Sequence, residues 1–460
     1  MGRLVLNMKT LIRNGMLIDP AAGVHAQLNL LLDDGRVAAV TQDTPEADRV
    51  IDAAGRVVAP GFLDIHMHED PVEADGTLYA DPEKSIFRCM LRQGVTTAVA
   101  GNCGENKYHP ADYLDIVDRE GAAVNVAMLA GHGWFRQQAG ATDKYAPAAP
   151  EQIDAMADAI AQSLKRGCIG VSYGIRYIPG MDERELRLTA IPCAAENKLV
   201  AAHIRDDAEA VFDAAREFID AAAPLGVPLQ VSHIGSMAGF GQMERFLTLI
   251  DAYRARGTDV LCDCYPYDAF STGIGETTYD PGWLERYGCG YDVVELVEGD
   301  YKGQRCTEEI FESERAAHPD YMTIAHVMQQ DDVDLAFRHP GVLIGSDGTL
   351  SAGQGHPRAA GAFPRVLGRY VRAGKPSLDD ALARMTALPA QQLGLTNKGT
   401  LRVGADADLV IFDPETILDR ATFEAPLTAP VSIDYVFVGG ALALDHGAVT
   451  NARAGRAVRR

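Results

Sequence analysis

APGFLDIHMHED, residues 59–70, is an apolar run that ends in two histidines, His66 and His68, separated by one residue. Side chains alternate along a β-strand, so residues two apart point the same way and can bind one metal ion. Neutral imidazole is a zinc ligand in proteins, with Zn–N distances of about 2.0–2.1 Å. The stretch therefore predicts a strand whose carboxyl end carries a metal site.

Seven further apolar runs of similar length follow in the middle of the chain, and helical stretches such as AEAVFDAAREFIDAAA (208–223) separate them. Continuous apolar runs between helices are typical of buried parallel strands in βα units. Eight such strands favour a closed (β/α)8 barrel of the TIM type over an open sheet. The seven runs are VTTAVAGN (95–102), NVAMLAGH (125–132), CIGVSYGI (168–175), LVAAHIRD (199–206), PLQVSHIG (228–235), DVLCDCYP (259–266) and GVLIGSDG (341–348).

Both ends of the chain differ from this middle and are rich in short alternating runs. Residues 1–58 are punctuated by Asn14-Gly15, Asp34-Gly35 and Gly55, which predicts hairpins at these points. Residues 400–450 show the same pattern in GADADLVIFDP and IDYVFVGGALALDHG. We expect the two ends to form one small β-sandwich domain, with the barrel over residues 59–399. The last dozen residues, ending in ARAGRAVRR, are expected to be a frayed or loosely docked tail.

The segment from about 281 to 325 breaks the alternation of strands and helices. It contains Trp283, several glycines and many acidic residues, and it lies between the seventh and eighth apolar runs. We interpret it as an insertion in the barrel. A lid over an active site is one hypothesis for its role.

Composition narrows the class of protein. The chain has 460 residues, 47% hydrophobic and 23% charged, as is typical of a soluble globular enzyme. Its net charge of −22 argues against a nucleic-acid partner, because phosphate binding needs basic patches. No run of 18 apolar residues and no secretory pattern occurs, so we expect no membrane span and a reducing cytoplasm where the eight cysteines stay thiols. A homo-oligomer is left open.

Polar residues of metal-binding type follow the apolar runs at their carboxyl ends. Besides the two histidines, Cys103 follows the second run, His203 ends the fifth, His233 the sixth and Asp347 the eighth. In a (β/α)8 barrel these strand ends converge on the face where active sites lie. A packed or hydrogen-bonded histidine explains any one of them, but it does not explain all six. The pattern predicts a metal-dependent active site.

Cys103 lies between Asn102 and Gly104, just beyond its strand, where a core residue is less natural. Thiolate favours zinc over harder cations such as magnesium. One alternative is a buried cysteine of the core, and another is a nucleophile beside a histidine base. Four nearby histidines favour the metal ligand.

Asp347 is the candidate general base. A carboxylate beside the metal can take a proton from the attacking water and deliver one to a leaving nitrogen. The ordinary alternative is an aspartate that caps a turn before Gly348. Arg358 could clamp a substrate carboxylate through two hydrogen bonds. Three further residues follow barrel strands and are expected to line the pocket, namely Tyr177, Tyr265 and Ser271.

The chain resembles the N-acyl-D-amino-acid deacylase (D-aminoacylase) family of the amidohydrolase superfamily almost from end to end. His-x-His marks only the superfamily, whereas VAGNCG around Cys103 and HPRAAGAFPRVLGRYVR from His356 are more specific to this branch. The resemblance implies zinc-dependent hydrolysis of the amide bond of a small-molecule N-acyl-D-amino acid. The products would be a carboxylate and a free D-amino acid.

The resemblance also implies roles for the residues singled out above. A tightly bound zinc would have Cys103, His203 and His233 as ligands. A second, weaker metal position would have His66, His68 and Asp347, with Cys103 shared between the two positions. Asp347 would be the catalytic acid and base. The amino-acid part of the substrate would be held by Arg358, Tyr177, Tyr265 and Ser271.

One departure from the family pattern bears on the substrate. Family members typically have a lysine two residues after the strand-six histidine, and this chain has Gly235 there. The loss leaves the substrate carboxylate to Arg358, or indicates a different amide. The alternative function is a cyclic-amide hydrolase of the hydantoinase or dihydroorotase type. Cys103 and the absence of a lysine in strand four argue against it, and the complete ligand set argues against a non-catalytic metal-binding scaffold.

Overall fold

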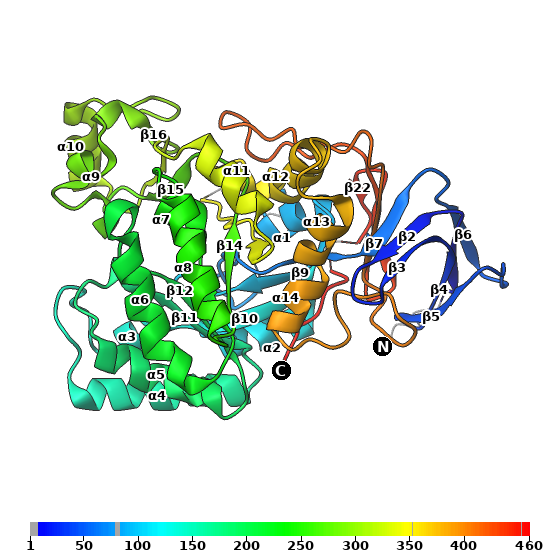
Figure 1. The fold of residues 1–460 in the computed structure, drawn as a ribbon, viewed down its shortest axis with the longest axis horizontal. Coiled ribbons are helices and arrows are strands. Elements are labelled where there is room, and N and C mark those ends of the chain that lie inside the picture. The colour runs from blue at the N-terminus through cyan, green and yellow to red at the C-terminus, as the bar shows by residue number, and fades with distance from the viewer. Residues whose placement is uncertain (1–7, 79–82, 352, 452) are drawn as a thin grey trace.

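Eight parallel strands form the barrel at the centre of the computed structural model, which describes residues 8–78, 83–351, 353–451 and 453–460 (Figure 1). Neighbouring strands follow the order of the sequence, so the predicted (β/α)8 barrel is confirmed. The eight strands are β8 (Phe62–Asp64), β9 (Val95–Ala100), β10 (Asn125–Gly131), β11 (Gly170–Gly174), β12 (Leu199–His203), β13 (Leu229–Val231), β14 (Val260–Cys264) and β18 (Val342–Ile344).

Hydrogen bonds just beyond the ends of β8 and β18 close the barrel. Asp347 N donates to His66 O at 2.7 Å, and His68 N donates to Gly348 O at 2.9 Å. β8 itself ends at Asp64, so the two histidines lie on the segment that follows the strand rather than within it. The seam therefore carries three of the predicted metal ligands at the carboxyl end of the barrel.

Helices cover the outside of the barrel, and α6 (Val211–Ala222) shows why the sequence folds in this way. Its buried positions include Val211, Ala214, Ala215, Phe218 and Ile219, which is the spacing of one helical face. The other long helices of the barrel are α2 (Pro110–Glu120), α4 (Pro150–Lys165), α5 (Glu183–Ala194), α8 (Met243–Ala255), α11 (Gln330–Arg338), α12 (Arg358–Arg365) and α13 (Leu378–Met385).

The two ends of the chain meet in two β-sheets beside the barrel (Figure 1). One sheet has the order β5-β4-β1-β6, and the other, which joins both ends, has the order β22-β21-β20-β19-β7-β2-β3. Leu17, Leu30, Ile51, Leu409 and Phe437 belong to the shared core, so the predicted sandwich is confirmed. The strands are β1 (Thr10–Arg13), β2 (Met16–Asp19), β3 (Val24–Gln27), β4 (Asn29–Asp33), β5 (Arg36–Thr41), β6 (Arg49–Asp52), β7 (Val57–Pro60), β19 (Leu409–Phe412), β20 (Ile433–Val438), β21 (Ala441–Asp445) and β22 (Ala448–Val449).

Only one of the three predicted hairpins in the N-terminal part exists. Asp34-Gly35 joins the antiparallel neighbours β4 and β5. The predictions at Asn14-Gly15 and Gly55 were wrong, because the chain there passes from one sheet to the other. Asn14 and Gly55 both have a positive φ. The left-handed conformation that suits a hairpin equally suits a turn between sheets, and the sequence does not distinguish them.

A small antiparallel sheet and two helices interrupt the barrel between β14 and β18. The sheet has the order β15-β17-β16, and Trp283 and Phe311 pack in a hydrophobic cluster of this part of the chain. In Figure 1 this lobe lies at the upper left, at one end of the barrel. Its elements are β15 (Phe270–Gly273), α9 (Trp283–Tyr287), β16 (Val294–Leu296), α10 (Glu308–Ala317) and β17 (Met322–Ala325).

The C-terminal tail is docked, so the prediction of a loose tail was wrong. Val126 N donates to Arg456 O at 3.0 Å, and Val458 N donates to Val126 O at 2.8 Å. The Arg459 guanidinium lies 2.8 Å from carboxylate oxygens of Asp115 and Asp118. These contacts lie beside the start of β10, at the opposite end of the barrel from the strand carboxyl ends. The arginines that suggest a solvated tail instead pair with acidic residues of α2.

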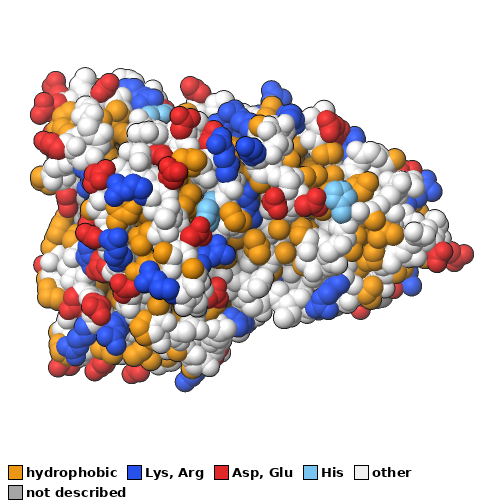
Figure 2. Space-filling view, in the orientation of Figure 1, with side chains coloured by type: hydrophobic (Ala, Val, Ile, Leu, Met, Phe, Trp, Pro, Cys, Tyr) orange, Lys and Arg blue, Asp and Glu red, His pale blue; other side chains and the backbone are white. Residues whose placement is uncertain are grey.

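The surface shows mixed charge, and no described helix could span a membrane. On the face in Figure 2, acidic and basic side chains are interspersed over the molecule. Among the described residues, no helix is both long and apolar enough to cross a lipid bilayer. All eight cysteines belong to the described part of the chain and are free thiols.

Candidate metal centre and active site

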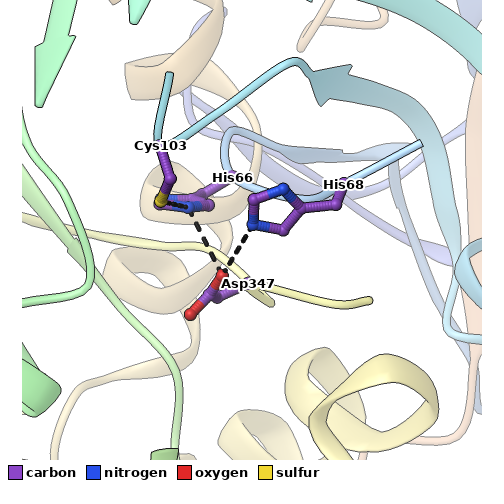
Figure 3. A group of neighbouring side chains, drawn as sticks. All are labelled: His66, His68, Cys103 and Asp347. Atoms are coloured by element: carbon purple, nitrogen blue, oxygen red, sulfur yellow. Dashed lines mark hydrogen bonds and ion pairs between the residues drawn. The ribbon is translucent and has the colours of Figure 1, made fainter. Parts of the chain in front are cut away.

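The six predicted metal ligands converge at the carboxyl ends of the barrel strands. They form two groups, within each of which the candidate ligand atoms all lie within 4.8 Å of one another. Cys103 belongs to both groups, and the members are buried apart from His68, whose side chain is 12% exposed. The first group is His66, His68, Cys103 and Asp347, drawn in Figure 3, and the second is Cys103, His203 and His233.

Cys103 and Asp347 are the centres of the contacts between these side chains. Cys103 Sγ lies 3.4 Å from Nε2 of His66 and 3.4 Å from Nε2 of His233. Asp347 Oδ1 lies 3.4 Å from Nε2 of His66 and 3.3 Å from Nε2 of His68, as the dashed lines in Figure 3 show. His203 packs edge-on against His233, with 4.4 Å between ring centroids. The thiol is therefore placed to serve both groups at once.

Three of the six residues have an unusual backbone. Cys103, His233 and Asp347 have φ values of 54°, 33° and 48°, in the left-handed region that non-glycine residues rarely adopt. Each follows directly on a barrel strand or lies within three residues of its end. Such conformations cost free energy and cluster at functional sites. Their presence at three converging strand ends supports a functional role for the cluster.

Burial and neighbouring charges set the ionisation of the cluster. Burial raises the pKa of Cys103, but His66 and His233 outweigh burial and hold it well below the usual range. Burial also raises the pKa of Asp347, whereas Arg358 and His66 lower it well below the usual range. Both groups therefore favour their anionic forms. Anionic sulfur and oxygen are the forms that bind a cation.

The donor set fits zinc. Thiolate, imidazole and carboxylate are its protein ligands, and a thiolate beside imidazoles is not a set that magnesium or calcium prefers. The second group offers one sulfur and two imidazoles, which leaves a fourth tetrahedral position open for water or substrate. His203 Nδ1 is buried and has no hydrogen-bond partner among the described residues. A buried ring nitrogen without a partner is what a bound metal or ordered water would satisfy.

Arg358 is the first residue of α12 and points at the cluster. One of its guanidinium nitrogens, Nη1, lies 2.9 Å from Asp347 Oδ2, and the side chain is only 2% exposed. The guanidinium also lies over the ring of Tyr265, 4.5 Å from its centroid. The structure thus places a cation beside the predicted acid–base residue, in the wall of the cavity above the metal groups.

The other three predicted substrate residues lie in different positions. Tyr177, in the 3-10 turn η1 (Ile175–Tyr177), packs edge-on against His203 with 4.7 Å between ring centroids. Ser271, in β15, lines the cavity, and its hydroxyl has no hydrogen-bond partner within the described chain. Tyr265 is absent from the lining of both cavities found at the cluster and instead packs against Arg358. A contact between Tyr265 and substrate remains a prediction. In the structure, the Tyr265 ring packs against the guanidinium of Arg358 and so helps to hold that side chain in place.

Two adjoining cavities open over the cluster. The smaller one, about 240 Å³, has His68, Cys103, His233, Asp347 and Arg358 in its lining. The larger one, about 420 Å³, extends from Cys103 past Tyr177 to Trp134 and Lys144. The residues that line both cavities are Cys103, Glu105, Lys107, Tyr177 and Glu276. The metal groups therefore lie at the junction of a small chamber and a larger polar side chamber.

Gly235, where the related enzymes are expected to have a lysine, lies at the start of α7 (Ile234–Ala238) and is buried. A Cβ atom at this position would lie 3.0 Å from Met328 Cε and 3.1 Å from Cys264 Sγ. Both distances are shorter than ordinary van der Waals contacts. The space beside this residue is thus occupied by apolar side chains, and any longer side chain here would require Met328 or Cys264 to move.

Several buried residues that hold the predicted site in place were missed at the level of sequence. Glu69 accepts hydrogen bonds from Gly101 N and Lys107 N, at the two ends of the loop that carries Cys103. His356 accepts from Arg358 N at 3.0 Å and, through Nε2, lies 3.0 Å from Ala269 O. Glu69 follows the His-x-His pair directly, and His356 precedes Arg358 by two residues. Their closeness to these motifs is the only feature of the sequence that could have indicated a role at the site.

Asp263 was missed for a different reason. It lies in β14 between Cys262 and Cys264 and is fully buried. Its carboxylate contacts His66 Nδ1 at 3.1–3.2 Å and accepts from His233 N at 2.8 Å. The run VLCDC reads as an apolar strand, and a carboxylate inside it was the only indication that this strand also faces the site.

Comparison with known protein families decides which family the chain belongs to. The model described as the amidohydrolase family matches residues 49–443, which is most of the chain. The chain belongs to the amidohydrolase family. This assignment agrees with the resemblance inferred from the motifs around Cys103 and Arg358.

Within this family, the chain is similar over almost its whole length to deacylases of N-acyl-D-amino acids. The N-acyl-D-glutamate deacylase of Alcaligenes xylosoxydans xylosoxydans is 33% identical, with 98% of this chain and 96% of that protein covered. A structure of N-acyl-D-glutamate deacylase from Bordetella bronchiseptica, complexed with zinc and a phosphonate that mimics the tetrahedral intermediate, gives a TM-score of 0.88 at 32% identity, with 99% and 100% covered. A D-aminoacylase structure with a binuclear metal centre gives 0.87 at 29% identity, with 98% and 100% covered.

Proposed function

We propose that this protein hydrolyses the amide bond of N-acyl-D-amino acids with zinc as its metal, releasing a carboxylate and a free D-amino acid. The observation that carries the proposal is the pair of groups sharing Cys103, with Asp347 and Arg358 beside them. The full-length similarity to N-acyl-D-glutamate deacylase, and to its zinc and phosphonate complex, supports the same class of reaction.

We assign the tighter zinc position to Cys103, His203 and His233, and a second, weaker position to His66, His68 and Asp347 with Cys103 shared. Bound zinc polarises a carbonyl oxygen and makes an attacking water more acidic. The related D-aminoacylase with a binuclear metal centre supports two positions. With only three protein ligands, Cys103, His203 and His233 would leave one coordination position of a bound zinc for water or substrate, as catalytic zinc sites do.

Asp347 moves the proton in this scheme. Its carboxylate is anionic before the reaction, because Arg358 and His66 lower its pKa. It can therefore accept the proton of the attacking water and then deliver it to the nitrogen of the departing D-amino acid. Oδ1 lies within 3.4 Å of the Nε2 atoms of His66 and His68, so this carboxylate oxygen faces the cluster.

Arg358 is positioned to hold the carboxylate of the amino-acid part. A guanidinium in a nearly enclosed site pairs well with a carboxylate through two parallel hydrogen bonds. Because Arg358 lines only the smaller cavity and Trp134 and Lys144 line only the larger one, the amino acid would occupy the smaller cavity. The acyl group would then extend towards the side chamber. With Gly235 in place of a lysine, Arg358 bears this contact without a second cation at that position.

We propose further that the substrate is a small molecule met in the cytoplasm and that nucleic acid is not a partner. The free thiols of all eight cysteines support a reducing environment. The net charge of −22 opposes phosphate binding.

A substrate panel tests the proposal. Zinc-loaded protein is assayed for amine release from N-acetyl-D-amino acids and their L-enantiomers, and for ring opening of hydantoins and dihydroorotate. We expect kcat/KM for at least one N-acetyl-D-amino acid to exceed that for its L-enantiomer by more than about 100-fold. The reason is that Arg358 would hold the carboxylate, the side chamber the acyl group and the metal the amide, and together these contacts select one configuration at the α-carbon. Activity confined to cyclic amides would favour the hydantoinase or dihydroorotase alternative and overturn the proposed substrate class.

A further inference from the structure

We propose that Asp263 is a positioning residue that serves both metal groups: it keeps a proton on Nδ1 of His66, so that Nε2 is free to bind metal, and it anchors the backbone of His233. The inference rests on the proposed function only in taking these histidines as metal ligands. It concerns a carboxylate that lies outside both ligand groups.

The contacts of Asp263 connect the two groups. Oδ2 lies 3.2 Å from His66 Nδ1 and accepts from Gln230 Nε2 at 2.5 Å. Oδ1 lies 3.1 Å from the same His66 nitrogen and accepts from His233 N at 2.8 Å. His66 belongs to one metal group and His233 to the other. A single side chain from β14 therefore contacts a ligand of each group.

The partners of Asp263 fix the direction of each of its hydrogen bonds. The backbone N–H of His233 can only donate, and the Gln230 amide donates as placed. A carboxylate only accepts, so the remaining partner, His66 Nδ1, carries a proton and donates it. A neutral imidazole has one protonated nitrogen, and Nε2 is then the bare one. His66 Nε2 is the nitrogen that faces Cys103 and Asp347, at 3.4 Å from each.

His233 has a parallel arrangement with a different partner. Ser236 Oγ lies 2.9 Å from His233 Nδ1 and donates to His233 O at 3.0 Å. Because the hydroxyl proton is used for that carbonyl, Oγ accepts from Nδ1–H of the ring. Nε2 of His233 is again left facing Cys103. Ser236 thus fixes the ring of His233, while Asp263 fixes its backbone and the ring of His66.

The strained conformation of His233 explains why a backbone anchor matters. Its φ of 33° lies in the left-handed region, which costs free energy for a residue with a side chain. The hydrogen bond from His233 N to Asp263 Oδ1 holds the chain at this point. The side chain of Asp263 is completely buried, so water does not compete for these bonds.

Asp263→Asn separates this role from general packing, because the two side chains have nearly the same shape. The asparagine oxygen can still accept from His233 N, but its NH₂ group then faces His66 Nδ1 and Gln230. Gln230 can rotate its amide, since its Oε1 has no hydrogen-bond partner in the described chain. In the wild-type protein the hydrogen bond of His66 Nδ1 goes to Oδ2, the position that the NH₂ group takes. The NH₂ group therefore favours a bare Nδ1 on His66 with the proton on Nε2, where it opposes metal binding.

Asp64→Asn is the matched control. Asp64 is also fully buried and also contacts His66, but its Oδ1 accepts from two backbone groups, His66 N and Ser346 N. An asparagine oxygen can take over both bonds, and the ring of His66 is not involved. The control therefore removes a buried carboxylate near the same histidine without changing the ring's proton.

The first measurement is zinc affinity, determined by competition with a chromophoric chelator for full-length wild type, D263N and D64N. We expect D263N to weaken zinc binding at the His66 position by about 10–100-fold, as is typical when a partner of a metal ligand is lost. D64N should stay within about threefold of wild type. Wild-type zinc affinities in D263N would overturn the inference. No zinc binding by wild type would instead remove the proposed function.

The second measurement reads the proton directly and does not depend on how many metals bind. Nitrogen-15 NMR of histidine-labelled protein, with His66 assigned by the signal lost in His66→Gln, distinguishes protonated from bare Nδ1. We expect a protonated Nδ1 in wild type and D64N, with or without zinc, and a bare Nδ1 in D263N. A bare Nδ1 on His66 of the wild-type protein would contradict the proposal even if D263N failed to fold.

Discussion

Asp347 has two properties that a general base at this site needs. It lies against the ligand histidines, and its neighbours keep it ionised. The ordinary role of an aspartate before glycine is to cap a turn, yet its side chain is buried against Arg358. We expect Asp347→Asn to keep the fold and the zinc held by Cys103, His203 and His233. Turnover should fall by about 10²–10⁴-fold, the range for loss of a general acid–base group.

The measurement for this prediction is kcat at saturating substrate, together with zinc content and thermal unfolding of the same preparation. Zinc content near wild type with turnover lost would locate the defect in the proton transfer. Turnover within about tenfold of wild type would remove Asp347 from the catalytic role.

Arg358 and Arg365 offer a matched pair on one helix. Both guanidinium groups lie over tyrosine rings, 4.5 Å from the centroid of Tyr265 and 4.4 Å from that of Tyr267. Only Arg358 lines the small cavity, whereas Arg365 pairs with Asp419. We expect Arg358→Lys to raise KM for N-acyl-D-amino acids by about 10-fold or more, because lysine cannot form two parallel bonds to a carboxylate.

Arg365→Lys serves as the control in the same assay. It should leave KM within about threefold of wild type. Equal effects of the two substitutions would show that α12 tolerates neither change for structural reasons, and Arg358 would lose its assigned contact with the substrate carboxylate.

At the scale of elements, the lobe between β14 and β18 carries part of the cavity wall. Five residues of this lobe line the small cavity, namely Ser271, Glu276, Pro319, Asp320 and Met322. None of the six predicted metal ligands lies in this lobe. The lobe therefore has the position expected of a cover over the substrate rather than of a metal-binding element.

Replacing residues 281–321 by a short glycine–serine linker tests this role. We expect zinc content to stay near wild type and kcat/KM to fall by about 10-fold or more, because the wall that excludes water from the substrate is removed. Zinc content and kcat/KM are measured on the same sample. Unchanged kcat/KM would show that the lobe is not a lid, and loss of zinc would show that it supports the metal site instead.

The sequence predicts the elements of the barrel better than those of the sandwich. Each barrel strand is buried on both faces, so its apolar run is continuous and easily recognised, as in β10 and β12. The turns at Asn14 and Gly55 were misassigned, because a left-handed residue specifies a change of direction but not the strand that pairs next. The docked tail was missed for a similar reason, since its partners lie more than 300 residues away in the sequence.

For the whole molecule, the ligands were predictable and their supports were not. His203 is the last residue of its strand, and Cys103, His233 and Asp347 lie just beyond theirs. The topology of the barrel brings all of these strand ends to one face, independently of the loop sequences. Asp263 points to the site from within a strand, so its role depends on the register of β14 against its neighbours. Registers of this kind are settled by packing in the folded protein, and the alternation of apolar residues leaves them open.

Dependence of D-specific hydrolysis on zinc is the central claim for the molecule as a whole. The most direct test removes metal from the full-length protein with a chelator and then adds zinc back stepwise. Release of free amine is followed from the best N-acetyl-D-amino acid of the panel. We predict that the metal-free protein stays folded and inactive and that about one equivalent of zinc restores activity. A single zinc held by Cys103, His203 and His233, with one coordination position left for water or substrate, suffices for the reaction. Full activity without metal, or no amine release at any zinc level, would contradict the account.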